Sequence, residues 1–460
     1  MHCRSVSRAT GRWALAALAC ALTASACAEE EPSPQDRSLQ ELRRLVEEMR
    51  REHEAEIAAL RRQLEDVRAD SEKTALEAEV ERFLEETTAP EGEEGKPFVA
   101  RGLGLQALNP EISVVGDVFT TYTDRAGEPW RTDFFFRVLG IHIESYLDPY
   151  SRLKAAVGVN ANGAWLGEAY FTRFGLLPRF NATAGKFRQQ FGVVNRWHKH
   201  SLDQADFPLA LRSIFGEGGL NQTGFSFEWG LPEWGEASQA LIFEITGGTN
   251  DRLFGGNPRH LPSLLGRYKN YRDLTASTYL EGGLTGLVGW NEEWPVTTGG
   301  TTVTERDRRV TAVLGADLSL LWEPTDRMRY ANLEWRSEAY VLRKELLAPD
   351  GSGPDTLVAW GVYTYVQRKV SRTVEVGIRV DYYRPDTKDY ADAGGLAPLA
   401  VASGSAYRWH VGPYLTWWQS PFVRVRVEGG YTDGHGTGPS ELTLALQLTF
   451  AAGPHKHERY

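Results

Sequence analysis

The chain has 460 residues, a formal net charge of −10 and 42% hydrophobic residues, including 14 Trp, 18 Tyr and 19 Phe. The acidic balance and the lack of a glycine-rich phosphate-binding motif argue against nucleic-acid binding. No apolar run of about 18 residues follows the N-terminal leader, which excludes a protein that crosses a membrane with helices. Of the 3 cysteines, Cys3 and Cys20 lie in the leader, so the processed chain cannot form an internal disulfide.

Residues 1–28 have the pattern of an export signal. Three arginines precede the apolar run WALAALACALTASA, which is too short to span a bilayer and ends in small residues. The stretch ASAC also resembles a bacterial lipobox that would make Cys27 the lipidated first residue, although Ala24 stands where leucine is usual. Lipidation at Cys27 and cleavage of an ordinary signal peptide both stay open. Either one predicts export from the cytoplasm of a bacterium with an outer membrane.

Residues 29–86 are predicted to form a helix in the periplasm, followed by a Pro/Gly/Glu linker over residues 87–107. The run from Leu39 to Glu86 contains no Gly or Pro, and at 1.5 Å per residue it would be roughly 70 Å long. We expect it to self-associate, with a trimer as one arrangement, and a single solvated helix is the alternative. Its apolar residues recur at the 3-4 spacing of a coiled coil, with a stutter near His53: Leu39, Leu42, Val46, Met49, Ile57, Leu60, Leu64, Val67, Leu76, Val80 and Phe83.

Residues 108–460 change to a pattern of strands and turns. In the stretch RTVEVGIRVDYY, apolar residues from Val374 to Tyr382 alternate with polar ones from Thr373 to Asp381. A strand places successive side chains on opposite faces, so one face is apolar and the other is charged. Such a strand fits a soluble sandwich, whose apolar face meets a core, or a membrane barrel, whose apolar face meets lipid. Several runs reach roughly 10 to 14 residues, which suits a tilted membrane span of about 9–11.

The connections between these strands favour a membrane barrel over a soluble sandwich. Tight breaks alternate with long polar ones, and aromatic residues cluster at strand ends, as in bacterial outer-membrane barrels. The sequence therefore predicts an all-β, up-and-down antiparallel transmembrane barrel of about 16 strands, with a range of 14–18. The number is even, as single-chain bacterial barrels require. We expect Phe450 to end the last strand, with a short tail on the inner side.

Several stretches of the sequence resemble those of a known family. They are LNPEISVVGDVFTTY, AGKFRQQFGVVNRWH, FGEGGLNQTGFSF and LQLTFAAGPHKH, within a similarity that spans about Leu108–His457. The resemblance is to poorly characterised bacterial outer-membrane porin-like β-barrels, near the phosphate-selective porins and sometimes labelled zinc-regulated TonB-dependent receptors. It implies a barrel in the outer membrane. The receptor label conflicts with the sequence, because such receptors carry a globular plug before the barrel and a helix with a linker stands there instead.

The lumen face is expected to be polar and to lean basic. The segment Asn195–Gly224, after about the fifth strand, is the candidate constriction loop. Rings of Arg and Lys favour anions, whereas a mixed-charge wall that simply admits water is the alternative. The pore-lining and constriction candidates are Arg152, Lys154, Arg188, Arg196, His198, Lys199, His200, Arg212, Arg379, Arg424, Arg426 and Glu428.

The predicted function is passive diffusion of small hydrophilic solutes through a porin-like channel in outer-membrane lipid. A structural protein that tethers the outer membrane through the coiled coil is one alternative. A barrel enzyme is another, but His142 and His410 have no nucleophile motif beside them, so we expect no enzyme. The pairs His198-x-His200 and His455-x-His457 are weak metal patterns, so neither a metal nor a cofactor is predicted.

Overall fold

The computed structural model describes residues 110–453, except 234, 236, 389–398 and 402–403. The leader, the helix at 29–86, the linker, His455 and His457 therefore lie outside the described residues. Four short helices accompany the strands: η1 (Val194–Arg196), η2 (Lys199–Ser201), α3 (Leu209–Phe215) and α4 (Asp251–Phe254). None of the helices in this part of the chain is long and apolar enough to cross a bilayer.

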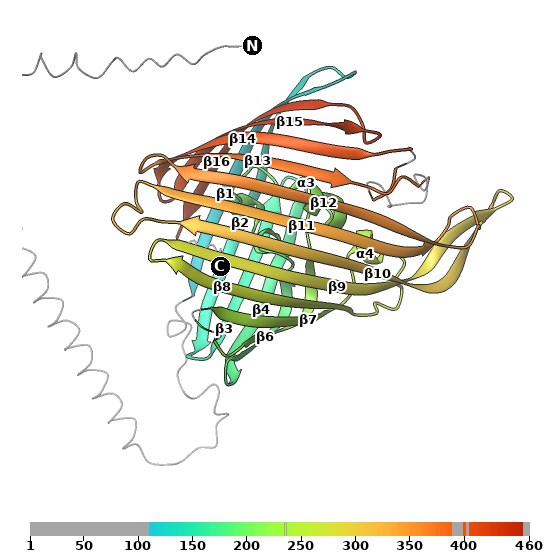
Figure 1. Cartoon of the computed structure of the whole chain (residues 1–460), viewed down its shortest axis with the longest axis horizontal. Helices are drawn as coiled ribbons and strands as arrows, with labels where there is room; N and C mark the ends of the chain where they lie inside the picture. The colour runs from blue at the N-terminus through green and yellow to red at the C-terminus, as the bar shows by residue number, and fades with distance from the viewer. Residues whose placement is uncertain (1–109, 234, 236, 389–398, 402–403, 454–460) are drawn as a thin grey trace, which may run out of the picture. The chain divides into compact units, whose positions relative to one another are not determined.

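The strands form one closed antiparallel barrel (Figure 1). The predicted number of about 16 is confirmed. In chain order they are β1 (Glu111–Arg125), β2 (Arg131–Asp148), β3 (Ser151–Asn160), β4 (Gly163–Leu177), β5 (Phe180–Arg188), β6 (Asn221–Gly230), β7 (Ser238–Thr246), β8 (Ser263–Thr275), β9 (Thr278–Thr298), β10 (Thr301–Trp322), β11 (Asn332–Leu347), β12 (Pro354–Lys369), β13 (Val374–Arg384), β14 (Tyr407–Ser420), β15 (Val423–His435) and β16 (Glu441–Ala452).

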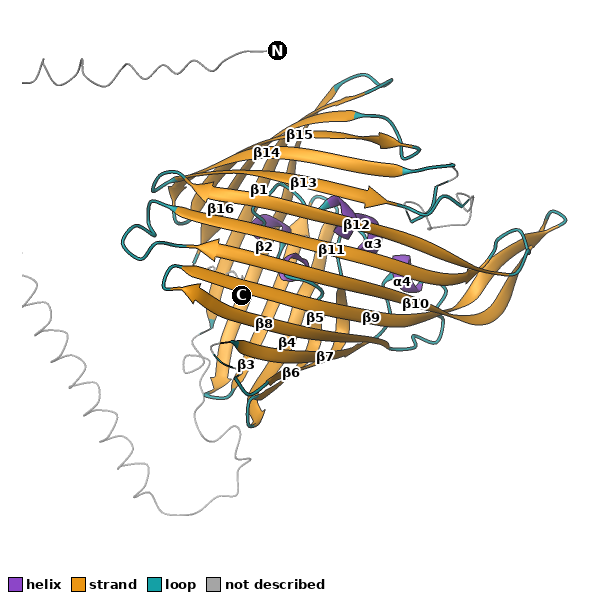
Figure 2. Ribbon diagram, in the orientation of Figure 1, coloured by secondary structure: helices purple, strands orange, loops and turns teal. Residues whose placement is uncertain are grey.

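The wall closes where the first strand meets the last. β1 pairs antiparallel with β16, with Asp117 opposite Thr449, and every other strand pairs with its neighbours in sequence (Figure 2). The last strand ends at Ala452, two residues beyond the predicted end at Phe450. A closed wall leaves no strand edge running the length of the sheet, which is the arrangement that lets a sheet sit in lipid.

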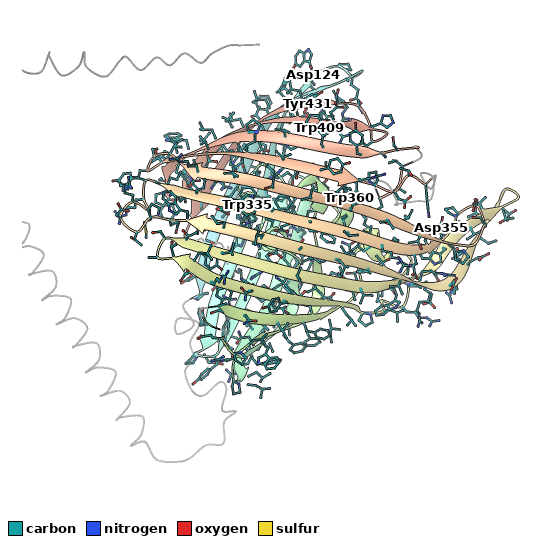
Figure 3. The ribbon with its side chains drawn as sticks, viewed as in Figure 1. Asp124, Trp335, Asp355, Trp360, Trp409 and Tyr431 are labelled. Atoms are coloured by element: carbon teal, nitrogen blue, oxygen red, sulfur yellow. The ribbon has the colours of Figure 1, made fainter. Side chains whose placement is uncertain are left out.

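The outer face of the wall is apolar and the inner face is polar. Along β16, Leu444 and Leu446 are 52% and 47% exposed, whereas Gln447, on the opposite face of the strand, is 1% exposed. β13 repeats the pattern, with Ile378 exposed and Arg379 buried inside. Figure 3 labels further side chains of the wall, among them the exposed Trp360 and Tyr431. This inside-out distribution excludes the soluble sandwich, in which apolar faces would be buried against each other.

The connections are of two kinds. Tight turns join β2 to β3 and β4 to β5, whereas the hairpin of β9 and β10 extends well beyond the rest of the wall (Figure 1). Two long connections, residues 189–220 and 247–262, carry all four short helices, which lie within the ring of strands (Figure 2). The side on which β2 joins β3 is called here the turn side, and the side that carries the two long connections is called the loop side; β3–β4 and β9–β10 are also joined by two residues, but on the loop side.

The connection between β5 and β6 fills part of the lumen with its own apolar side chains. Phe191, Phe207 and Ile214 are fully buried, and they form one cluster with wall residues such as Tyr340 and Leu342. The expected boundaries Asn195–Gly224 were wrong at both ends. The segment leaves the wall at Gln189 and returns at Leu220, because residues 221–224 already pair with β5 in the ladder.

The exposed face of β16 gives a test of the solvent around the wall. Changing Leu446 to Arg places a charge in the middle of this strand, and we expect a loss of about 2–4 kcal/mol in the free energy of unfolding. The measurement is urea unfolding of the barrel in phospholipid vesicles. Met328→Arg is the matched control, because Met328 is also about half exposed but lies in the turn between β10 and β11. Equal losses for the two variants would contradict a lipid-facing β16.

Candidate functional site

The candidate site is the lumen and the segment Gln189–Leu220, called here the constriction segment. Its backbone N–H groups donate to carboxylates of the wall. Because ionised acceptors make the stronger hydrogen bonds, these contacts fix the course of the segment. They run from Val193 and Val194 to Glu338 Oε1 (3.0 Å each), from Ala205 to Glu428 Oε2 (2.7 Å) and from Leu209 to Asp381 Oδ1 (3.1 Å).

Arginines of the wall hold the carbonyl groups of the same segment. The donors come from β2, β13 and β15, so the segment is held against one arc of the ring, which runs from β13 through β16 and β1 to β2. The bonds are Arg137 Nη1 to Ala205 O (2.6 Å), Arg379 Nη1 to Asp206 O (2.7 Å), Arg426 Nη1 to Gln204 O (3.0 Å) and Arg424 Nη2 to His200 O.

These contacts divide the predicted pore-lining residues into two groups. Arg379, Arg424, Arg426 and Glu428 lie on the inner face but are buried against the constriction segment, with 2–7% of their surface exposed. A buried charge needs hydrogen-bond partners, and each of these four has one on the backbone of the constriction segment; Arg379 is also ion-paired with Asp381 (2.8 Å). Their charges are therefore used to anchor the segment.

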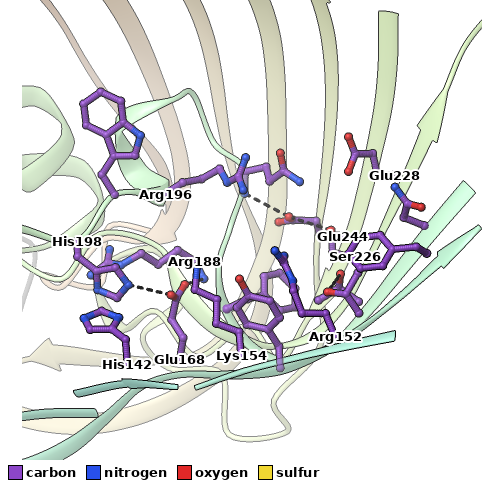
Figure 4. Close-up of a pocket in the computed structure, with 18 of the residues that line it drawn as sticks. His142, Arg152, Lys154, Glu168, Arg188, Arg196, His198, Ser226, Glu228 and Glu244 are labelled. Carbon is purple, nitrogen blue, oxygen red and sulfur yellow. Dashed lines mark hydrogen bonds and ion pairs between the residues drawn. The ribbon is translucent and has the colours of Figure 1, made fainter. Parts of the chain in front are cut away.

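The other half of the lumen, along β2 to β7, keeps open space. A cavity of about 130 Å³ on the turn side is lined by Arg152, Lys154, Arg188, Arg196 and Glu244, among others (Figure 4). We call it the turn-side cavity. A second cavity of about 440 Å³ reaches toward the loop side, where Arg137 and Trp165 line it. We call it the loop-side cavity.

The two cavities adjoin at a small polar group. His142, Arg188 and His198 line both of them. Glu168 accepts the backbone N–H of Arg188 (2.9 Å) and lies 2.9 Å from Nε2 of His198, the contact dashed in Figure 4. The His142 ring lies 5.0 Å from the ring of His198 and 5.3 Å from that of His200. A solute that moved along this wall would pass these rings.

Basic side chains outnumber acidic ones along the two cavities. The lining includes four glutamates, Glu168, Glu217, Glu228 and Glu244. Three of the lining cations, Arg137, Arg152 and Lys199, are also ion-paired with carboxylates that do not line the cavities, which are Asp117, Glu144 and Asp206. The seven cations are Arg137, Arg152, Lys154, Lys186, Arg188, Arg196 and Lys199.

Two further predicted residues, Lys199 and Arg212, form ion pairs inside the constriction segment. Lys199 Nζ lies 2.9 Å from Asp206 Oδ1, and Arg212 Nη1 lies 3.5 Å from Asp206 Oδ2. Burial alone would raise the pKa of Asp206, but Arg212 and Lys199 lower it to about 2. Asp206 therefore stays ionised at any physiological pH. Arg212, unlike Lys199, lines neither cavity, and it also approaches Glu217 (3.7 Å).

Sequence reasoning missed several residues of this site. Glu168 could have been found, because it alternates with Tyr170 and Thr172, which also line the turn-side cavity. Arg137 and Trp165 could not, since β-bulges shift the register beside each of them and reverse the face that strict alternation assigns. In the described part of the chain, no group of three or more His, Cys, Asp or Glu side chains is arranged to hold a metal ion.

No family model matches the chain. An uncharacterized protein of Aquifex aeolicus (strain VF5) is 27% identical over 335 residues, which are 67% of this chain and 66% of that protein, just under two thirds of its length.

The chain is also similar to solved structures of bacterial proteins. Their identities are too low to transfer a solute or an assembly state. They include an anion-selective porin from Comamonas acidovorans (10% identity, TM-score 0.47, 75% of this chain and 99% of that one), the outer membrane channel DcaP of Acinetobacter baumannii (11%, 0.48, 75% and 97%) and OprB of Pseudomonas putida (10%, 0.46, 75% and 94%).

Gly192 offers a test of how the constriction segment is held. Its φ is +65°, and a Cβ there would lie 2.1 Å from Glu338 Oε2, the carboxylate that holds Val193 and Val194. We expect Gly192→Ala to loosen the segment, lowering the melting temperature and speeding proteolytic cleavage between residues 189 and 220. Gly218→Ala is the control, since a Cβ at Gly218 would meet nothing within 4 Å. Equal cleavage rates in the two variants would show that this carboxylate does not hold the segment.

Proposed function

We propose that the protein is an outer-membrane channel for passive diffusion of small hydrophilic solutes. The observation that carries the proposal is the closed wall with an apolar outside and a polar inside. In this proposal the tight turns face the periplasm and the long loops face outward, as is general for such barrels. The channel is the half of the lumen along β2 to β7, beside the anchored constriction segment.

Size and charge support a small and preferably anionic solute. The turn-side cavity holds only about 130 Å³, which suits ions and small polar molecules. Its cations include Arg152, Lys154 and Arg196, and Arg188 stands at the junction with the loop-side cavity. Basic groups along the wall of a channel lower the energy of a passing anion and raise that of a cation.

The proposal extends to the N-terminal part of the chain. There the helix at residues 29–86 lies in the periplasm and joins copies of the protein, with a trimer as one arrangement. The support is the apolar seam of the sequence, which would bury little surface in a single helix. The mass of the full chain in detergent, measured by sedimentation, tests this extension. In the described residues, nothing favours the tether or the enzyme over the channel.

Planar-bilayer recording of the purified full chain tests the channel directly. Stable pores with a conductance that rises with salt concentration are expected. A barrel that is folded by circular dichroism but electrically silent would overturn the proposal and leave the anchoring role of the coiled coil as the better account.

Ion selectivity tests whether the basic side chains in the half of the lumen along β2 to β7 determine which ions pass. We expect Arg152→Glu combined with Arg196→Glu to lower the chloride-over-potassium permeability ratio by about tenfold, because one charge of the wall and one of the constriction segment are reversed in sign. The measurement is the reversal potential in a salt gradient. Arg327→Glu is the control, since this arginine lies in the turn between β10 and β11 and is 70% exposed. Equal shifts in reversal potential for the two proteins would contradict this path.

Arg424 and Arg426 should respond differently, because their bonds go to the backbone of the constriction segment. A hydrogen bond to a charged group contributes about 1.5–3 kcal/mol, so Arg424→Ala with Arg426→Ala should release part of the segment. We expect a larger and noisier single-channel conductance with little change in reversal potential. An unchanged conductance together with a changed selectivity would instead place these arginines along the path of the ions.

A further inference from the structure

The barrel wall has a step between β4 and β5, because the ladder between these two strands stops short of the loop-side end of β4. Five of the six residues Gly163–Glu168 pair with β3 on one side, all but the bulged Gly167, whereas the ladder between β4 and β5 begins only at Ala169, opposite Lys186. β5 ends at Arg188, where the chain turns into the lumen as the constriction segment. The loop-side part of β4 therefore has a strand on one side only, as do residues 131–136 of β2, which pair with β1 beyond the end of β3.

Side chains take the place of the missing strand. Lys186 Nζ donates to the backbone oxygen of Leu166 (2.7 Å), and Asn221 Nδ2 donates to that of Gly167 (2.6 Å). A carbonyl group that faces hydrocarbon needs such a partner, since lipid supplies none. The edge of β4 is thus covered by two side chains rather than by a rigid ladder, and a side chain can move aside where a strand cannot.

The loop-side cavity extends to this edge. On the lumen side it is lined by His142, His198 and His200, and at the step by Leu166, Gly167, Lys186 and Asn221. Leu166 pairs with Val157, both belong to the apolar outer face, and Leu166 is 45% exposed. One cavity therefore touches both the polar interior and the apolar exterior of the wall.

Its lining has two chemical characters. Trp165, Leu166 and Val157 are apolar, whereas Arg137, Lys186 and Lys199 are cationic. A molecule with an apolar chain and an anionic head would match both, with the chain on the tryptophan and leucine side and the head on the basic side. A purely hydrophilic solute would leave the apolar part of this lining unused.

We propose that the step between β4 and β5 is a lateral portal through which amphipathic anions, such as long-chain carboxylates, pass between the lumen and the outer leaflet. The portal rests on the proposed channel, because it needs an accessible lumen. It adds a substrate class and a direction of movement that a simple diffusion pore lacks. Trp165 and Lys186 are its specificity-determining residues, one contacting the chain and the other the head of the solute.

The first arm of the test measures block of the channel current by dodecanoate in planar bilayers. We expect reversible block, and a concentration for half-block that rises at least about tenfold in Lys186→Glu, where the head group meets repulsion. Butyrate, which lacks the chain, and dodecyltrimethylammonium, which lacks the negative charge, should not block at the same concentrations. Arg327→Glu, in the turn between β10 and β11, should leave block unchanged.

The second arm decides whether the chain reaches the site through the wall. In vesicles of phospholipid brominated on the acyl chain, bromine quenches a tryptophan that it contacts. The contribution of Trp165 is the difference between the native protein and Trp165→Phe. Quenching of that difference supports the portal. Block without quenching means that dodecanoate binds from the ends of the lumen or that another copy of the chain covers the step, and it overturns the portal.

The two proposals can fail separately. A protein that conducts ions normally but is neither blocked by dodecanoate nor quenched through Trp165 keeps the channel and loses the portal. A silent barrel whose Trp165 is nevertheless quenched by brominated chains loses the channel and, with it, any lateral passage.

Discussion

The structure depends on one constraint, that a sheet surrounded by lipid must satisfy every backbone hydrogen bond within itself. The pairing of β1 with β16 meets it by closing the ring. Once the ring is closed, apolar side chains such as Leu446 can face outward without a protein partner, and charged ones such as Arg426 and Asp381 can face only inward. The lumen is then the one place where a polar segment of the chain can fold back.

The polar lumen is used in two ways. On one half, arginines and carboxylates of the wall bind the backbone of the constriction segment, and buried apolar residues such as Phe191 pack beneath it. On the other half the same residue types, among them Arg152 and Arg196, line open space. The chemistry of an arginine is the same in both places. What differs is how closely the segment packs against it, because Arg137 and Arg188 donate to carbonyl groups of the segment and still line a cavity.

The sequence predicted the barrel well, because the alternation of apolar and polar residues can be read within each strand by itself, and the apolar residues are those that face lipid. It also located the constriction segment after the fifth strand. It could not separate the anchoring Arg379, Arg424 and Arg426 from the lining Arg152 and Arg196, since that depends on contacts with a segment more than a hundred residues away in the chain.

Bulges set a second limit on what the sequence could predict. At Arg137 one extra residue turns the side chain to the lumen, against strict alternation, and near Trp165 a bulge has the same effect. Gly192 is a third case: its positive φ and its contact with Glu338 are set by long-range packing rather than by its neighbours in sequence.

The central claim is that lipid surrounds the wall and water fills the half of the lumen along β2 to β7. Cysteine substitution along β6, in vesicles, tests it most directly. Ser226→Cys and Glu228→Cys, which line the turn-side cavity, should react with a charged water-soluble thiol reagent. Phe225→Cys and Trp229→Cys, whose native side chains are exposed on the outer face, should resist it and react with a lipid-soluble one. Reaction of all four positions with the water-soluble reagent, or a reversed alternation, would contradict the account.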